Sequence, residues 1–431
     1  MAPPELGIPP TLPFDEAGDR GWDVVVIGAG PAGAMAAREA ALAGARVLLA
    51  DRASFPRQKV CGCCLNGAAI GALKQVGLGD LLQQCQARTL HAVRLASAGR
   101  FATVQLSTGV SLSRARLDAA LIRAAIAAGA EFLDQTQALI GDTTSDARRV
   151  VVYRPAEGAG PSLIGDTTSD ARCVILKRGT SEKLVSTKTI VVAGGLGCRV
   201  FAEPDRDERH ASRASRVGAG TILDFAPAEY GSGTVYMACH RHGYVGLVRL
   251  EDNRLDVAAA LDADAIKQHG GIAALVDQIL THARLPVPAD LNSANWHGTG
   301  RLTQHREQVV AERCFFIGDA AGYVEPFTGE GIAAALASGR AVTPIVLEFL
   351  RDGRQSNARL AWTSHQALLA KRARLCRYIS RLLRSPALMS MAVRVLAVAP
   401  SLAHPVLKAL NASFEASLVT SATARVGPVT K

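Results

Sequence analysis

Residues 22–33 read WDVVVIGAGPAG and carry the strongest structural signal in the chain. The short β-branched run Trp22–Ile27 predicts a buried strand, and the alanine-rich segment Pro31–Ala43 predicts a helix. A second apolar run, Ala45–Ala50, predicts the next strand. Strand, helix and strand within roughly 30 residues predict a right-handed parallel crossover, and therefore an α/β fold.

Gly28, Gly30 and Gly33 form the pattern GxGxxG between the first strand and the helix. Gly28 permits a tight turn, Gly30 lets the backbone approach a pyrophosphate, and Gly33 allows close helix–strand packing. The helix N-terminus offers unpaired N–H groups to phosphates. Asp51, at the end of the second strand, is placed to accept ribose hydroxyls. The sequence thus predicts a Rossmann-like dinucleotide site, whose candidate residues are Gly28, Gly30, Ala32, Gly33, Asp51 and Arg52.

A second strand-to-helix turn lies far along the chain, in residues 314–332 (CFFIGDAAGYVEPFTGEGI). An NAD site needs no second acidic strand end, whereas FAD has a ribityl chain that Asp319 could hold. The N–H groups of residues 329–332 could face the flavin edge where reduction places negative charge. The pair of turns therefore predicts FAD, with candidate residues Asp319, Gly329, Gly331 and Ile332.

Together these two turns resemble the flavoprotein monooxygenase superfamily, which has the para-hydroxybenzoate hydroxylase fold. Residues 55–62 (FPRQKVCG) resemble the FPRxKxCG stretch of the geranylgeranyl reductase family. Residues 113–118 (SRARLD) resemble that family's helix, whose leading arginine borders FAD. The resemblance spans residues 22–345 and implies that Arg57 and Arg114 bind FAD and that Cys61 lies in the active site.

The same resemblance implies an interleaved organisation. We expect a discontinuous FAD-binding domain, a smaller β-sheet substrate domain over the flavin, and a C-terminal helical region. The proline-rich start of the chain is expected to be a flexible tail. The expected boundaries are 1–21 for the tail, 22–90, 111–200 and 300–345 for the FAD-binding domain, 91–110 and 201–299 for the substrate domain, and 346–431 for the helical region.

For function, the resemblance implies reduction of carbon–carbon double bonds in a hydrophobic, isoprenoid- or lipid-like substrate, with hydride from reduced flavin. NAD(P)H or another reductant would supply the electrons. Cys61 is the candidate catalytic proton donor, since a thiol of pKa about 8.5 is a weak acid near neutral pH. Its neighbours Arg57 and Lys59 favour the thiolate, which argues against that role. The alternatives for Cys61 are a buried residue lining the flavin, or a redox dithiol with Cys64.

Two other functions share the FAD site: a monooxygenase that hydroxylates an aromatic or polyketide-like substrate, and a flavin-binding protein without turnover. Halogenation of the usual kind is disfavoured, because Trp22, Trp296 and Trp362 are too far apart to form WxWxIP. The superfamily's middle motif reads Asp-Gly, but Gly194 stands in place of the aspartate, which argues against direct use of NAD(P)H. Tyr244 is the nearest candidate for an aromatic cavity motif.

The net charge of +10 is confined to the C-terminal part of the chain. Residues 353–414 contain ten basic and no acidic residues, and the remaining 38 basic residues equal the 38 acidic ones. Near Pro386, which is expected to end the helix, a basic arc of Arg374, Arg377, Arg381 and Arg384 adjoins an apolar arc of Leu375, Ile379, Leu382 and Leu383.

This pattern predicts peripheral contact of residues 371–385 with an anionic bilayer, the alternative being a core helix with a solvated basic rim. We expect no nucleic-acid partner, because the charge is confined to a helical tail. No apolar run reaches the roughly 18 residues of a membrane span, and no signal peptide is recognisable. The expected location is the cytoplasm, at the inner membrane surface.

The chain has three smaller features: its cysteines, a pair of histidines and a repeat. The nine cysteines show no second cluster at metal-ligand spacing, and His240 and His242 alone make a poor metal site, so no metal is expected. The decapeptide LIGDTTSDAR occurs at Leu139–Arg148 and again at Leu163–Arg172. Two copies are too few for a solenoid, so a duplicated turn-strand unit that lengthens a hairpin is predicted.

Overall fold

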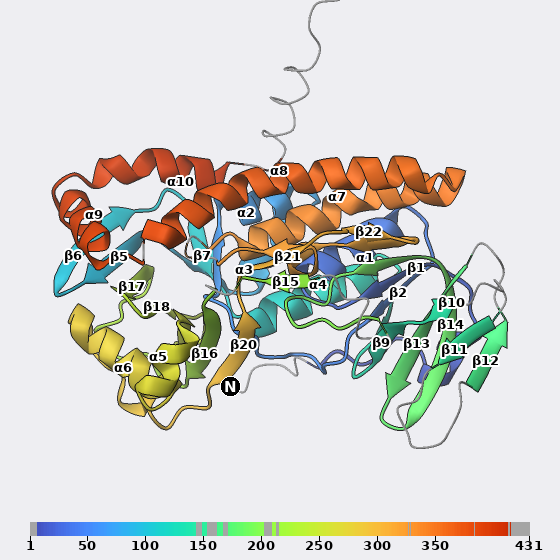
Figure 1. Ribbon diagram of the computed structural model, residues 1–431, viewed down its shortest axis with the longest axis horizontal. Helices are drawn as coiled ribbons and strands as arrows, with labels where there is room; N and C mark the ends of the chain where they lie inside the picture. Colours follow the sequence, from blue (N-terminus) through green and yellow to red (C-terminus); the bar gives the residue numbers. More distant parts are fainter. Residues whose placement is uncertain are drawn as a thin grey trace, which may run out of the picture.

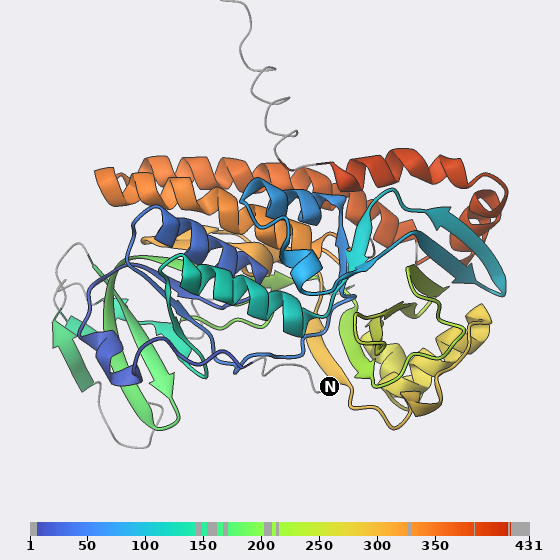
Figure 2. The same cartoon turned by 180° about the vertical axis from the view of Figure 1, so that it is seen from behind.

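The computed structural model is an α/β protein with two large sheets and a layer of long helices (Figures 1 and 2). In both views, α7 (Gly331–Asp352) and α8 (Gln355–Leu382) run side by side along one long edge of the molecule. The structure describes residues 7–143, 149–152, 162–166, 171–201, 209–212, 215–325, 327, 329–382, 384–412 and 414.

The first sheet is built on the predicted crossover. Its central strands follow the order β22-β23-β14-β1-β2-β8, and β13 joins β14 to β9. β1 pairs in parallel with both β2 and β14, so the predicted parallel sheet is confirmed. The strand bounds are β1 Trp22–Ile27, β2 Val47–Ala50, β8 Glu131–Leu133, β9 Gln137–Ile140, β13 Arg172–Arg178, β14 Ser181–Val192, β22 Val310–Ala311 and β23 Cys314–Phe316.

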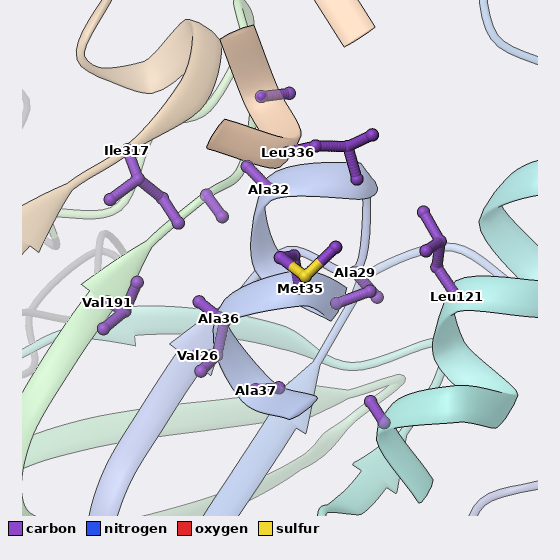
Figure 3. Close-up of a cluster of buried hydrophobic side chains, with 14 of the residues drawn as sticks. Val26, Ala29, Ala32, Met35, Ala36, Ala37, Leu121, Val191, Ile317 and Leu336 are labelled. Carbon is purple, nitrogen blue, oxygen red and sulfur yellow. The ribbon is translucent and has the colours of Figure 1, made fainter. Parts of the chain in front are cut away.

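Helix α1 (Pro31–Leu42) is packed between this sheet, α4 (Arg114–Ala127) and α7. Figure 3 shows Met35 and its alanine neighbours directed toward Val26, Val191 and Leu336. The helices α1 and α7 approach very closely, because a Cβ on Gly339 would lie 2.3 Å from the carbonyl oxygen of Ala32. The absence of a side chain at Gly339 on α7 therefore permits this close approach to the backbone of α1.

The second sheet has seven strands in the order β20-β16-β19-β18-β17-β5-β6. Helix α6 (Ile272–Ala283) packs on it through an apolar face that includes Leu275 and Ile279. The predicted antiparallel pair within residues 91–107 is present as β5 and β6. The bounds are β5 Ala92–Ser97, β6 Arg100–Gln105, β16 Val217–Leu223, β17 Thr234–His240, β18 Gly243–Arg249, β19 Leu255–Leu261 and β20 His297–Arg301.

Short elements connect the two sheets. The three strands β3, β7 and β4 form one small sheet, and β15, β21 and β24 form another. Their bounds and those of the short helices are β3 Cys64–Asn66, α2 Gly67–Gln75, α3 Leu81–Gln84, β4 Arg88–Thr89, β7 Gly109–Ser111, β15 Arg209–Ala211, α5 Ala263–Gln268, η3 Ala289–Leu291, β21 Gln304–Arg306, η4 Gly318–Ala320 and β24 Gly322–Tyr323.

The C-terminal helices span both halves of the molecule. Helix α8 is held to the first sheet by Trp362, whose Nε1 donates to the carbonyl oxygen of Phe316 at 3.0 Å. Pro386 begins α9 (Pro386–Val398), which packs on β5 and β6, and η5 (Pro400–Ala403) leads into α10 (His404–Asn411). The prediction that the helix ends before Pro386 is confirmed, although Leu383 lies outside the described residues.

Membrane spans were not expected from the sequence. Within the described ranges, α7 is long and apolar enough to cross a bilayer, and half of its most apolar window is buried in the protein. Helix α9 and the η5–α10 segment pass the same test together, but they are bent by 119°. These two helices therefore form a corner rather than one straight rod.

The prediction of a flexible tail is wrong for residues 7–21. Ile8, Leu12 and Phe14 are buried, and the backbone N–H of Thr11 donates to the carbonyl oxygen of Phe132 at 3.0 Å. A 3-10 helix, η1 (Phe14–Gly18), ends beside Trp22. The prolines misled the prediction, because the apolar residues between them cover part of the first sheet. Residues 1–6 lie outside the described residues.

The two copies of the decapeptide repeat have different partners. Leu139 of the first copy lies in β9, whereas Leu163 of the second lies in β12. A separate antiparallel sheet is formed by β10 (Asp142–Thr143) in the first copy, β11 (Arg149–Val152) between the copies and β12 (Ser162–Asp166) at the start of the second copy. The rest of both copies lies outside the described residues, except for Gly141 and the last two residues of the second copy.

Candidate functional site

A cavity of about 1190 Å³ is lined by residues from both sheets and from the C-terminal helices. Its volume exceeds the roughly 300–1,000 Å³ of a pocket for one drug-sized ligand. All candidate site residues from the sequence line it except Gly33, although they come from six separate stretches of the chain. The lining candidates are Gly28, Gly30, Ala32, Asp51, Arg52, Arg57, Cys61, Arg114, Asp319, Gly329, Gly331 and Ile332.

The glycine turn has the geometry that its pattern predicts. Gly28 has φ +102°, and a Cβ there would lie 2.7 Å from the carbonyl oxygen of Ala193. A Cβ on Gly33 would lie 1.8 Å from the carbonyl oxygen of Gly28, which no real side chain tolerates. Gly33 does not line the cavity. Because it has no side chain, the first turn of α1 can pack directly on the glycine turn.

Two guanidinium groups flank Gly30. A Cβ at this position would lie 3.6 Å from Nη2 of Arg57 and 3.8 Å from Nη2 of Arg114. The N-terminus of α1 begins at the next residue. Helix N-termini and arginine forks both favour phosphate oxygens, so this end of the cavity fits a pyrophosphate.

Asp51 is positioned by its own backbone surroundings. Its carboxylate accepts hydrogen bonds from the backbone N–H groups of Ala29 at 2.7 Å and Ala53 at 2.9 Å, and from Arg57 at 3.2 Å. A carboxylate has about four lone-pair sites, so it retains acceptor capacity toward the cavity. This capacity is what a ribose hydroxyl requires.

Arg114 is itself fixed by a buried partner. Its Nε and Nη2 donate to the two carboxylate oxygens of Asp118, each at 2.8 Å, and Asp118 has no exposed surface. Arg57 Nε lies 3.7 Å from the same carboxylate. The fork geometry fixes both the charge and the orientation of Arg114 at the cavity wall.

The structure explains why the middle motif lacks its aspartate. A Cβ on Gly194 would lie 1.9 Å from Sγ of Cys198, so any side chain at this position would displace Cys198. A Cβ on the next residue, Gly195, would lie 3.0 Å from Nζ of Lys59. The backbone of the middle motif is thus packed against Cys198 and Lys59.

Asp319 lies in a charged corner of the cavity with Lys59. Burial raises the pKa of Asp319, and Lys59 and Arg114 oppose that shift electrostatically. Burial and the nearby Arg114 lower the pKa of Lys59. Lys59 was considered from the sequence only as a neighbour of Cys61, and the structure adds it to the groups that line the cavity beside Asp319.

Cys61 lies in the cavity wall beside Cys63. Hydrogen bonding from Cys63 outweighs burial and, together with Arg114, lowers the pKa of Cys61 to about 6. The sequence assigned the thiolate-stabilising charge to Arg57 and Lys59, whereas the structure gives that role to Arg114. The redox pair Cys61–Cys64 gains no support, since the contact is with Cys63 and all nine cysteines are free thiols.

This environment predicts the pH dependence of Cys61 alkylation. The rate of iodoacetamide reaction at Cys61, followed by peptide mass spectrometry, is expected to rise with a midpoint near pH 6, because the thiolate is the reacting form. Burial raises the pKa of Cys64 well above that of an ordinary thiol, so Cys64 serves as an internal reference that stays unmodified. A midpoint above pH 8 for Cys61 would contradict the arrangement.

The far part of the cavity is apolar and aromatic. Tyr244, the residue suggested by the sequence, packs edge-on against Phe327 with 5.0 Å between ring centroids. Tyr323 also lines the wall. The C-terminal helices contribute Ile379, Leu382, Met389, Met391, Val395, Leu396, Leu402, Val406, Leu407 and Leu410. This end fits a long hydrocarbon better than a small polar molecule.

The two histidines of the sequence analysis do not line the cavity. His240 and His242 lie with ring centroids 5.2 Å apart, and His282 and His269 contact them in turn. Burial, with the neighbouring histidines, lowers the pKa of His240 to about 4. Across the described ranges, no group of three or more His, Cys, Asp or Glu side chains could hold a metal ion.

Sequence reasoning missed two buried charged groups. Arg216, which has no exposed surface, lies 3.0 Å from Glu325 and 3.4 Å from Asp262. Asp256, which is 4% exposed, lies with its Oδ1 atom 3.4 Å from Sγ of Cys63. The partners lie far apart in the sequence, and a charged residue inside an apolar strand such as LDVAAAL was the one available signal.

Comparisons with known proteins identify the cofactor. Residues 21–163 match the family model described as "FAD binding domain". Menaquinone reductase of Mycobacterium tuberculosis H37Rv is 29% identical over 406 residues, which cover 88% of this chain and 91% of that protein. Geranylgeranyl diphosphate reductase of Rhodobacter capsulatus is 26% identical over 357 residues, covering 79% of this chain and 78% of that protein.

The solved structures agree on the fold. Para-nitrophenol 4-monooxygenase from Pseudomonas putida DLL-E4 superposes with a TM-score of 0.68 at 12% identity, covering 91% of this chain and 99% of that one. Flavin-dependent halogenases are also among the similar structures. The predicted resemblance, the FAD cofactor and the para-hydroxybenzoate hydroxylase-like fold are confirmed. The chain is an FAD-dependent oxidoreductase.

Proposed function

We propose that this oxidoreductase reduces carbon–carbon double bonds in a hydrophobic, isoprenoid- or lipid-like substrate. The observation that carries the proposal is the cavity, which Cys61 and the apolar side chains of the C-terminal helices line together. The reductases of M. tuberculosis and R. capsulatus, similar over more than three quarters of the chain, support the same class of substrate. When bound and reduced, FAD supplies a hydride for such reactions.

The residues of the chain have separate tasks in this proposal. Arg57 and Arg114 hold the pyrophosphate at Gly30, and Asp51 and Asp319 accept hydroxyls toward the two ends of the cofactor. Tyr244 and Phe327 exclude water from the apolar wall. Cys61 delivers a proton to one carbon of the double bond, and the hydride goes to the other carbon.

The experiment is product analysis after incubation with reduced FAD. Polyprenyl compounds, such as geranylgeranyl diphosphate or a menaquinone, are expected to gain the mass of two hydrogens for each double bond reduced. Gain of one oxygen atom would instead support the second candidate, a monooxygenase of an aromatic or polyketide-like substrate, which the fold of the solved monooxygenases favours. Comparing turnover with NADPH and with dithionite tests whether NADPH is the reductant, and the absence of an aspartate at Gly194 favours another donor.

We also propose that the protein contacts an anionic membrane surface. The C-terminal helices carry exposed apolar side chains: Leu382, Met391, Val395, Leu402 and Val406 line the cavity, whereas Leu388 and Val398 do not. Helix α9 thus carries both lining residues and exposed apolar residues outside the cavity, and the exposed Arg374, Arg377 and Arg381 lie on the preceding helix. The contact predicted for residues 371–385 then extends across α9 and α10, at the cytoplasmic face of the inner membrane.

Removing positive charges from this surface tests the membrane contact. Each basic residue near an anionic surface contributes about 1 kcal/mol, so the triple variant R374Q/R377Q/R381Q should bind phosphatidylglycerol vesicles on the order of 100-fold more weakly. Cosedimentation measures the change. R20Q, which removes a surface arginine near the N-terminus, is the matched control. Equal binding of the triple variant and the control would contradict the contact.

A further inference from the structure

The proposed reduction requires a proton at Cys61, and the structure offers a source for it behind the cavity wall. Cys63 is 1% exposed and lies between Cys61 and Asp256. The Cys63 Sγ is 3.4 Å from Oδ1 of Asp256 and is in hydrogen-bonding contact with Cys61. Asp256 belongs to β19 of the second sheet and does not line the cavity.

Two further observations mark this cluster as unusual. The Oδ2 atom of Asp256 is buried and has no hydrogen-bond partner in the structure, which is costly for an ionised carboxylate. Cys63 has φ +48°, in the left-handed region that side chains other than glycine seldom occupy. Strained backbone of this kind clusters at functional sites.

We propose that Asp256 and Cys63 form a proton relay that ends at Cys61 and supplies the proton for double-bond reduction. The inference rests on the proposed function and adds two residues to it. The Asp256 carboxyl passes its proton to the Cys63 sulfur while the Cys63 thiol passes its own proton to the Cys61 thiolate. Cys61 then protonates the substrate carbon.

The charges in this sequence balance. Before transfer Asp256 is neutral and Cys61 is a thiolate; after transfer Asp256 is a carboxylate and Cys61 is a thiol. Protonation of the substrate returns Cys61 to the thiolate. When the product leaves, one proton from water in the cavity enters at Cys61 and restores the Asp256 carboxyl by the reverse path.

The electrostatic surroundings favour the state before transfer, in which Asp256 and Cys63 are protonated and Cys61 is a thiolate. Burial, reinforced by the charge on Cys61, raises the pKa of Asp256 well above that of an ordinary carboxyl. Contact with the Cys61 thiolate, followed by burial, raises the pKa of Cys63. Cys61 alone is mostly unprotonated at neutral pH, so a relay provides what it lacks. The other groups facing the cluster are Arg114, Glu251, Arg254, Cys64 and Tyr323.

The first test needs no substrate. C63G removes the sulfur while relieving the left-handed backbone, so folding is preserved, and C63S keeps a hydroxyl in its place. The midpoint of Cys61 alkylation is expected to rise by at least one pH unit in C63G and to return toward the wild-type value in C63S. An unchanged midpoint in C63G would overturn the relay whatever the reaction proves to be.

The second test measures proton delivery during turnover. D256N keeps the size of the side chain but has no transferable acid, so the single-turnover rate of substrate reduction is expected to fall at least 10-fold with FAD affinity unchanged. D264N, which removes an exposed carboxyl on α5, is the matched control and should reduce substrate at the wild-type rate. If the wild type reduces substrate and D256N does so at the same rate and with the same pH profile, the relay is wrong. If the wild type reduces no substrate, the proposed function fails instead, and the alkylation result still decides the cluster.

Discussion

Replacing Gly33 with alanine is expected to abolish FAD binding. The added Cβ would lie 1.8 Å from the carbonyl oxygen of Gly28 and 3.0 Å from Cβ of Ala193. Both neighbours are rigid, because one is backbone in the glycine turn and the other directly follows β14. The start of α1 must therefore move away from the turn, and the phosphate site at Gly30 is lost with it. We expect FAD affinity to fall by more than about 100-fold, measured by flavin fluorescence titration.

Gly71 provides the matched control. It lies within helix α2, has ordinary helical backbone, and a Cβ there would meet nothing within 4 Å. G71A should bind FAD normally and be more stable by up to about 1 kcal/mol, because alanine favours a helix more than glycine does. Normal FAD binding by G33A would show that α1 does not pack as described.

Replacing Arg114 with glutamine is expected to produce the largest loss of stability outside the glycine turn. Asp118 is fully buried, and Arg114, which donates two hydrogen bonds to its carboxylate, is its principal charge partner. Removing one member of a buried ion pair costs about 3–5 kcal/mol, because the remaining charge stays desolvated. Urea unfolding measures this free energy. The Cys61 alkylation midpoint should rise at the same time, since Arg114 stabilises the thiolate.

R114K separates charge from geometry. Lysine keeps the positive charge but cannot form the two parallel hydrogen bonds, so its stability should lie between those of the wild type and R114Q. An R114Q protein with wild-type stability and an unchanged midpoint would contradict the buried network.

Local patterns in the sequence were sufficient to predict the crossover and its cofactor. The WDVVVIGAGPAG stretch contains a strand, a turn and a helix start, and each follows from neighbouring residues. The turn at Asp319 could be joined to it only through the chemistry of FAD, and the structure places both in one cavity. The individual roles of the lining residues stay predictions.

Contacts across long separations were beyond sequence reasoning. Cys63 and Asp256 are 193 residues apart, and Arg216 and Glu325 are 109 apart. Neither pair follows from spacing, since each depends on how the second sheet meets the first. The prediction for the N-terminal tail was wrong for a related reason: its apolar residues become buried only when the sheet that they cover has formed.

The most direct test of double-bond reduction is anaerobic single turnover. The protein, with its FAD chemically reduced, is mixed without oxygen with a polyprenyl lipid, and the flavin absorbance is followed. We predict that the substrate reoxidises the flavin and that a saturated bond appears in the product. Reoxidation that occurs only after oxygen is admitted, with an oxygen atom gained by the substrate, would contradict the account.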